Sequence, residues 1–221
     1  MAAGNRKAVV SPCNVQNEVR LVVLGQTGVG KSAIVVRYLT RRFIGDYAPN
    51  LESVYNQSTK VDDQTVHLNI LDTPGDFDVE CQTRQEQMQK ADGAILVFSV
   101  TDRSSFNHLN KLKTCVTRGA KKDVDKLPAI LLGNKADLCH LRTITVSEGA
   151  EFAKELGCQY YEVSASDGSV EIVDAVHDLY REIYRAEKRA KVKKVSARLQ
   201  LRQTIKNFTD RHLYRSRTNT L

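Results

Sequence analysis

The feature that most constrains this chain is a glycine-rich octapeptide, G-Q-T-G-V-G-K-S, at residues 25–32. It follows an apolar run, Val19 to Leu24, and it leads into Ser32 to Arg42, where apolar residues recur at helical spacing. The octapeptide satisfies the pattern G-x-x-x-x-G-K-[ST], and a position between a strand and a helix is the context in which that pattern binds phosphate.

Such a loop holds phosphate mainly through its backbone. Glycines let successive N–H groups point at phosphate oxygens, and the N-terminus of the following helix adds partial positive charge. Lys31 is predicted to span the β and γ phosphates as a catalytic residue, and Ser32 to ligate Mg²⁺. The alternative is a glycine-rich turn met by chance. The predicted nucleotide contacts here are Gly25, Gln26, Thr27, Gly28, Val29, Gly30, Lys31, Ser32 and Ala33.

The rest of the chain alternates between apolar runs and stretches of helical periodicity, which predicts an α/β doubly wound fold with a mostly parallel sheet. The other predicted strands are Val66 to Leu71, Ala94 to Val100, Ala129 to Leu132 and Gln159 to Val163. The other predicted helices are Ser105 to Val116, Ser147 to Leu156 and Val170 to Tyr184. Val54 to Val61 adds an antiparallel edge strand, joined to the next strand by a turn at Asp62 and Asp63.

Composition excludes several functional classes. With 41% hydrophobic and 27% charged residues a globular chain is expected, and because no run of about 18 apolar residues occurs, we expect neither a membrane span nor a signal peptide. Its five cysteines are scattered without C-x-x-C spacing, so neither a disulfide framework nor a zinc site is expected. We expect an intracellular protein of the cytoplasm or nucleus.

A carboxylate at the end of a strand provides the second element of a metal site. Asp72 follows a predicted strand in the sequence L-D-T-P-G, and Gly75 completes a D-x-x-G pattern. Mg²⁺ needs few protein ligands, so Ser32, Asp72, phosphate oxygens and waters suffice. Asn50 could add a carbonyl oxygen to the metal. Taken alone, Asp72 could be an ordinary turn residue, and Asn50 could belong to a plain loop.

A third motif, N-K-A-D at residues 134–137, follows the predicted strand Ala129 to Leu132. An ionised Asp137 can accept two hydrogen bonds from guanine, whereas adenine offers no matching pair of donors. Lys135 would lie along the base, and Asn134 would tie this loop to the phosphate loop. Ser164 and Ala165 follow the last predicted strand, where the Ala165 amide could bind the guanine carbonyl. Together, these motifs predict GTP and GDP binding.

Over about residues 17–187 the motifs resemble the Ras-like small GTPase superfamily. The segment F-I-G-D-Y at residues 43–47, with Leu51, Glu52 and Tyr55, is most similar to the branch of the Ras-related oestrogen-regulated growth inhibitor and Ras-like family members eleven and twelve. The resemblance implies six strands and five helices, a P-loop NTPase fold, and a monomeric signalling switch that hydrolyses GTP with Mg²⁺. It further implies that Phe43 packs on the guanine ring and that effectors bind residues 45–56 and 75–90.

Three departures from the Ras pattern bear on hydrolysis. Asp76 replaces the glutamine that positions the attacking water, and an ionised carboxylate can only accept hydrogen bonds beside an anionic phosphate. Thr27 stands where Ras has glycine, and Asn50 replaces the switch threonine. We therefore predict slow intrinsic turnover, with Asp76 as the second catalytic position. The alternative is a nucleotide-binding scaffold with negligible turnover, and Gln82, Gln85 or Gln87 could replace the missing glutamine.

The charge is concentrated in the last residues. From Lys188 to Leu221, eleven lysines and arginines stand against Asp210, a charge of +10, so residues 1–187 carry −3 of the net +7. We predict a flexible N-terminus at 1–16, a nucleotide domain at 17–187 and a basic tail at 188–221. No C-terminal cysteine box is present, so no lipid anchor is expected. The tail is a solvated extension, or it binds an import receptor, acidic lipid or nucleic acid, or a partner groove. In an imperfect tail helix, one side would carry Val192, Val195, Leu199, Ile205 and Phe208.

Overall fold

The computed structural model describes residues 18–45, 51–75, 82–118 and 126–217. Its centre is one six-stranded sheet of spatial order β2-β3-β1-β4-β5-β6, in which only the β2–β3 pair is antiparallel. The mostly parallel doubly wound fold predicted from the sequence is confirmed. The strands are β1 (Glu18–Leu24), β2 (Ser53–Val61), β3 (Gln64–Asp72), β4 (Gly93–Ser99), β5 (Ala129–Asn134) and β6 (Gln159–Glu162).

Five α-helices accompany the strands, with a short 3-10 turn η2 (Cys139–Leu141) after β5. They are α1 (Lys31–Thr40), α2 (Gln82–Lys90), α3 (Arg103–Arg118), α4 (Val146–Leu156) and α5 (Val170–Arg217). The helix α4 begins at a capping box, because the Thr145 hydroxyl accepts from the Glu148 backbone N–H while the Glu148 carboxylate accepts from that of Thr145. Its C-terminus is capped by Gly157 in the left-handed conformation, φ 63°.

Helices cover both faces of the sheet, and the pleat of the strands decides which residues meet them. On β1, Leu21 and Val23 join a buried cluster with α1 and α5, whereas Val22 and Leu24 join a second cluster with α3 and α4. The strand β4 is buried along its whole length, as expected for a central strand covered on both faces.

The turn between β2 and β3 has the predicted geometry. Asp62 and Asp63 have φ values of 48° and 63°, which aspartate tolerates better than most residues and which suit a two-residue hairpin. The Asp62 carboxylate accepts two hydrogen bonds from the Arg181 guanidinium, at 2.6 and 3.0 Å, so this hairpin is attached to α5. The guanidinium lowers the pKa of Asp62.

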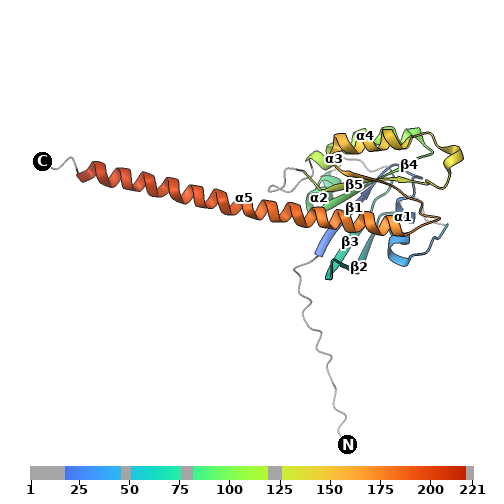
Figure 1. Cartoon of the computed structure of the whole chain (residues 1–221), viewed down its shortest axis with the longest axis horizontal. Helices are drawn as coiled ribbons and strands as arrows, with labels where there is room; N and C mark the ends of the chain where they lie inside the picture. Colours follow the sequence, from blue (N-terminus) through green and yellow to red (C-terminus); the bar gives the residue numbers. More distant parts are fainter. Residues whose placement is uncertain (1–17, 46–50, 76–81, 119–125, 218–221) are drawn as a thin grey trace, which may run out of the picture.

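The helix α5 differs most from expectation. It was predicted to end at Tyr184, yet it continues without interruption to Arg217, a length of 48 residues, and Figure 1 shows it projecting far beyond the sheet. Residues 170–217 contain neither glycine nor proline, so the sequence offers no helix terminator there. The predicted boundary between residues 187 and 188 therefore falls inside a helix. Among the described helices, none combines the length and the hydropathy that a membrane-spanning segment needs.

Candidate functional site

The predicted phosphate loop connects β1 to α1, as its motif requires. Gly30 directly precedes α1 in the left-handed conformation, φ 94°, and a side chain there would meet the Asn134 amide nitrogen at 2.3 Å. Only glycine therefore fits between the phosphate loop and the 134–137 segment. The first turn of α1 contains no acidic residue that would repel an anion.

Lys31 lies buried inside this loop. Its ammonium donates to the carbonyl oxygens of Gly25 at 2.9 Å and Gln26 at 3.2 Å, and only 7% of the residue is exposed. The charge is thereby held at the centre of the loop, where a phosphate chain would lie. The arrangement agrees with the predicted role of Lys31, which stays a prediction.

Asp72 and Ser32 meet at the carboxyl ends of the central strands. The Ser32 hydroxyl donates to Asp72 Oδ2 at 2.5 Å, and Val23 at the end of β1 is the register partner of Asp72 on β3. Asp72 is 2% exposed, and its other oxygen, Oδ1, is buried without a hydrogen-bond partner. Burial raises the pKa of Asp72, although Ser32 and Lys31 oppose the shift.

These two residues fit a magnesium site. A buried carboxylate oxygen without a partner is costly unless a cation or donor compensates it, and Mg²⁺ prefers carboxylate, hydroxyl and phosphate oxygens. Ser32 and Asp72 are therefore the residues that would hold the metal. Asn50, the third predicted ligand, lies outside the described residues, as does Asp76.

Asn134 joins the phosphate loop to the loop after β6. Its side-chain nitrogen donates to the Val29 carbonyl at 2.8 Å, and its side-chain oxygen accepts from the Ala165 amide at 3.2 Å. With 2% exposure, it is one of the few buried polar side chains of the described residues. Three segments far apart in sequence are thus held together by one amide.

Lys135 and Asp137 occupy the neighbouring positions of the loop after β5. Lys135 has a left-handed backbone, φ 66°, and its ammonium donates to the Gly28 carbonyl at 2.8 Å, a second link to the phosphate loop. Asp137 is exposed and accepts from the Ser164 hydroxyl at 2.6 Å. That bond fixes one carboxylate oxygen and leaves the carboxylate open toward solvent, where a base would approach.

The structure brings together most of the predicted contacts but not all. Gly25 to Ala33, Asp72, the 134–137 residues, Ser164 and Ala165 gather at the carboxyl edge of the sheet. The Ala165 amide donates to Asn134 at 3.2 Å, so its predicted bond to guanine, which stays a prediction, would have to share or replace this contact. Phe43 follows α1 and is 47% exposed, and its packing on a base stays a prediction.

Two contacts at this edge were not anticipated. Gly75 lies against Thr27 so closely that a Cβ on Gly75 would come within 1.8 Å of the Thr27 hydroxyl and 2.3 Å of its backbone nitrogen. The Gln87 amide donates to Glu52 at 2.9 Å and so joins α2 to the residue preceding β2. The D-x-x-G pattern marks Gly75 as a position that needs glycine, which is the signal that could have predicted its contact with Thr27. No spacing in the sequence pairs Gln87 with Glu52.

The fold and site define the class of the protein. A mostly parallel sheet, a G-x-x-x-x-G-K-S loop before α1, an aspartate at the end of β3 and an N-K-x-D segment that begins at the end of β5 are the parts of a P-loop guanine-nucleotide-binding domain. The model of the Ras family matches residues 20–185, so the chain belongs to the Ras family. Its members are small GTPases that act as GTP-binding signalling switches.

Individual relatives support the same assignment. The chain is 40% identical over 189 residues to the human "Ras-related and estrogen-regulated growth inhibitor", covering 85% of this chain and 93% of that protein. It is 38% identical over 172 residues to zebrafish "Ras-like protein family member 11B", covering 76% and 70% of the two chains. It is also 38% identical over 182 residues to mouse "Ras-like protein family member 12", covering 82% and 68%. The resemblance to this branch is confirmed.

Proposed function

We propose that this chain is a GTP-binding switch that retains guanine nucleotide with Mg²⁺ and hydrolyses GTP slowly. The observation that supports nucleotide binding is the pair of hydrogen bonds of Asn134. They attach the phosphate loop, residues 25–32, to the base-reading loop, residues 134–137, and to the loop after β6. Because both loops are already held in place, little ordering entropy is lost when a nucleotide binds.

Base selection falls to Asp137. Its carboxylate is oriented by the Ser164 hydroxyl at 2.6 Å, and Ser164 also accepts from the Asp167 backbone N–H at 3.1 Å. A carboxylate that is already oriented loses less conformational entropy when it binds guanine than a mobile one does. An adenine base would leave this carboxylate without hydrogen-bond donors in the complex. Phe43 and the Ala165 amide are proposed to add packing and a bond to the guanine carbonyl.

The proposed slow hydrolysis rests on two residues. Asp76 replaces the glutamine that orients the attacking water in Ras-type proteins. An ionised carboxylate cannot donate a hydrogen bond to a γ phosphate oxygen. Thr27 lies against Gly75, which is the residue just before Asp76. A β-branched side chain therefore occupies space beside the segment that would carry the attacking water.

A single-turnover assay tests this proposal. Full-length protein loaded with GTP and Mg²⁺ is compared with an Asp76→Gln variant, and with Asp78→Asn as a control that also removes a nearby carboxylate. We expect Asp76→Gln to raise the rate about tenfold or more, which corresponds to ~1.4 kcal/mol of barrier, and the control to match the wild type. Ordinary Ras-like turnover of the wild type, or equal rates for both variants, would refute the proposal.

A second candidate is a nucleotide-binding scaffold with negligible turnover. The described structure favours it in one respect, since Gln87 is engaged by Glu52 and is thus a poor substitute for the missing glutamine. Nucleotide release and turnover measured on the same preparation separate the two candidates, because a scaffold releases GTP unchanged whereas a slow enzyme releases GDP.

Partner surfaces form the last part of the proposal. Effectors are proposed to read residues 45–56 and 75–90, where Glu52 and Gln87 join the two segments. The basic part of α5, residues 188–217, is proposed to bind an import receptor, acidic lipid or nucleic acid. Imaging of a truncation after Glu187 distinguishes nuclear import from binding at a membrane. Monomeric state and the lack of a lipid anchor stay predictions.

A further inference from the structure

Residues 72–75 are attached at their start to the phosphate loop and to β1. The Asp72 carboxylate accepts from the Ser32 hydroxyl at 2.5 Å. The next residue, Thr73, donates its hydroxyl to the Val23 carbonyl at 2.6 Å. Asp72 and Thr73 are each only 2% exposed. The start of this segment is therefore packed beside the loop and has little freedom to move away from it.

Gly75, at the other end of the segment, is buried and lies against Thr27 of the phosphate loop. A Cβ on Gly75 would lie 1.8 Å from the Thr27 hydroxyl oxygen and 2.3 Å from the Thr27 backbone nitrogen. Because a carbon–carbon single bond is about 1.5 Å long, the Gly75 Cα lies no more than about 3.8 Å from that nitrogen. The two residues are thus in van der Waals contact, and no further atom fits between them.

This contact bears on where the third phosphate of GTP can lie. Lys31 and the Ser32–Asp72 pair, which are predicted to hold the β and γ phosphates and Mg²⁺, lie beside the same segment, and Lys31 acts electrostatically on the Asp72 carboxylate. An oxygen that accepts from two opposite donors keeps them roughly 6 Å apart, because each N–H···O distance is about 2.9 Å. The contact is much closer than that, so residues 72–75 must move off the loop to admit a γ phosphate. GDP ends one phosphate earlier and needs no such movement.

We propose that Thr27 is a specificity-determining residue that makes this protein bind GDP more tightly than GTP. The inference rests on the proposed function, since it assumes that guanine nucleotide binds at the phosphate loop. In the conformation described here Gly75 lies against Thr27, and GTP binds only when this contact opens. A ligand that needs a less populated conformation binds more weakly, in proportion to the fraction of molecules in that conformation.

The shape of the Thr27 side chain explains why this position determines the preference. A β-branched side chain has few χ1 rotamers, so Thr27 cannot easily turn out of the gap beside Gly75. A glycine at this position, as in the Ras pattern, would leave the same space open. Thr27 is therefore expected to act through its volume and not through its hydroxyl.

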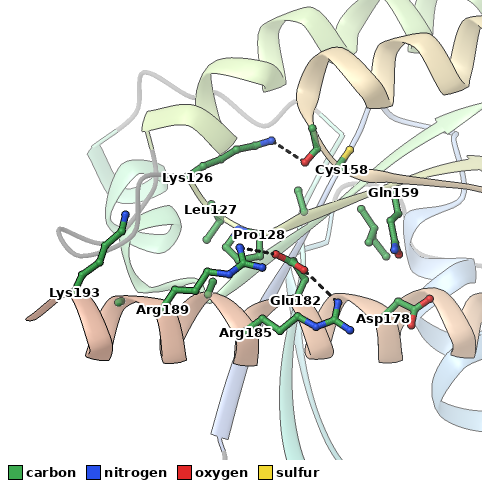
Figure 2. A pocket seen from close by; sticks show the side chains of 15 residues that line it. Lys126, Leu127, Pro128, Cys158, Gln159, Asp178, Glu182, Arg185, Arg189 and Lys193 are labelled. Carbon is green, nitrogen blue, oxygen red and sulfur yellow. Dashed lines mark hydrogen bonds and ion pairs between the residues drawn. The ribbon is translucent and has the colours of Figure 1, made fainter. Parts of the chain in front are cut away.

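The opposite edge of the sheet provides a region that this preference should not involve. There a cavity of about 530 Å³ lies between α5 and the amino ends of β5 and β6, as Figure 2 shows. Beside it, the Glu182 carboxylate pairs with Arg185 at 3.5 Å and with Arg189 at 3.6 Å. Because the nucleotide loops follow the carboxyl ends of the strands, Glu182→Gln should leave the affinities for both nucleotides unchanged.

Competition binding tests the inference with the full-length protein, Mg²⁺ and N-methylanthraniloyl-GDP, which is displaced by GDP or by the non-hydrolysable GTP analogue GppNHp. The readout is the ratio of the two Kd values, because a variant that is merely destabilised weakens both together. We expect the wild type to bind GppNHp at least tenfold more weakly than GDP. Thr27→Gly should bring the two values within threefold by strengthening GppNHp binding. Thr40→Ala, which truncates an exposed threonine at the end of α1, is the matched control and should keep the wild-type ratio.

A further variant separates volume from hydrogen bonding at the same position. Thr27→Val keeps the branched shape without the hydroxyl and should keep the preference for GDP. Equal affinity of the wild type for both nucleotides, an unchanged ratio in Thr27→Gly, or a lost preference in Thr27→Val would overturn the inference while GDP binding itself stays intact. Failure of the wild type to bind GDP would refute the proposed function and the inference with it, so the two failures are distinguishable.

Discussion

The two sides of the nucleotide site differ in how far they depart from the Ras pattern. On the base-reading side the motif is intact, and Asn134, Lys135 and Asp137 are each held in place by a hydrogen bond. On the side that would face the γ phosphate, Thr27, Asn50 and Asp76 all differ from the usual residues. We infer from this difference that guanine binding and GTP hydrolysis have separate structural requirements, and we expect only the second set to be altered here.

The largest expected effect breaks the base-reading side. Asp137→Ala should lower affinity for GDP about 100-fold or more, since two charge-assisted hydrogen bonds at roughly 1.5 kcal/mol each are lost. Isothermal titration with GDP and ADP measures it, and discrimination between the two should disappear. Asp167→Ala removes a neighbouring exposed carboxylate and serves as the control. A variant that still prefers GDP strongly would show that Asp137 does not read the base.

The next effect tests the link between the two sides. Asn134→Ala leaves the Val29 carbonyl and the Ala165 amide without their buried partner, which should cost about 2 to 4 kcal/mol of stability. Chemical denaturation measures the loss, and Asn110→Ala on the exposed face of α3 is the control. Stability equal to that of the control would mean that water replaces the amide at no cost.

A smaller effect is expected on the γ phosphate side. Thr27→Gly removes the side chain that lies against Gly75 and should raise GTP turnover by less than tenfold, about 1 kcal/mol of barrier or less. Affinity for GDP should change little, because the phosphate loop holds phosphate mainly through backbone N–H groups, which Thr27→Gly keeps. Thr27→Ser is the intermediate control, and its rate should fall between the other two. A loss of GDP affinity would show that the two sides are not separable.

The smallest expected effect concerns thermal stability at Glu148, a residue outside both sides of the nucleotide site. Contacts with Arg103 and Thr145 lower the pKa of Glu148 from 4.5 to about 2. A lowered folded pKa stabilises the protein above the unfolded value, and this contribution is lost as the pH falls from about 4.5 to about 2. Glu148→Gln should lower the Tm slightly at pH 7, and the difference should disappear near pH 2. A difference that grows on acidification would contradict the assigned cause.

Much of this architecture was predictable because the local signals agree with the tertiary structure. The phosphate loop, the aspartate at the end of β3 and the N-K-x-D segment are motifs whose position at the carboxyl end of a strand fixes their place at the sheet edge. Asp62 and Asp63 predicted the hairpin turn because few residues adopt positive φ easily. The parallel strands were predictable from runs of apolar residues, because a strand covered by helices on both faces of the sheet buries nearly all of its side chains.

The missed features lack such signals. The helix α2 is strongly polar, with Met88 as its buried hydrophobic side chain, so its sequence shows no apolar periodicity. The helix α5 was expected to end with its buried face, but a helix ends at a terminator and not at a change of composition. The Gln87–Glu52 contact depends on how distant elements pack, which no local pattern encodes.

The unbroken helix α5 fixes both the distance and the rotational angle between its far end and the nucleotide domain. At about 1.5 Å per residue, the 30 residues from 188 to 217 extend roughly 45 Å, and each residue turns the next by about 100°. A molecule bound near the far end would thus face the nucleotide domain in a defined rotational phase. Inserting two residues into α5 beyond residue 188 would rotate that molecule to nearly the opposite side of the helix axis. Inserting seven residues would almost restore its original orientation.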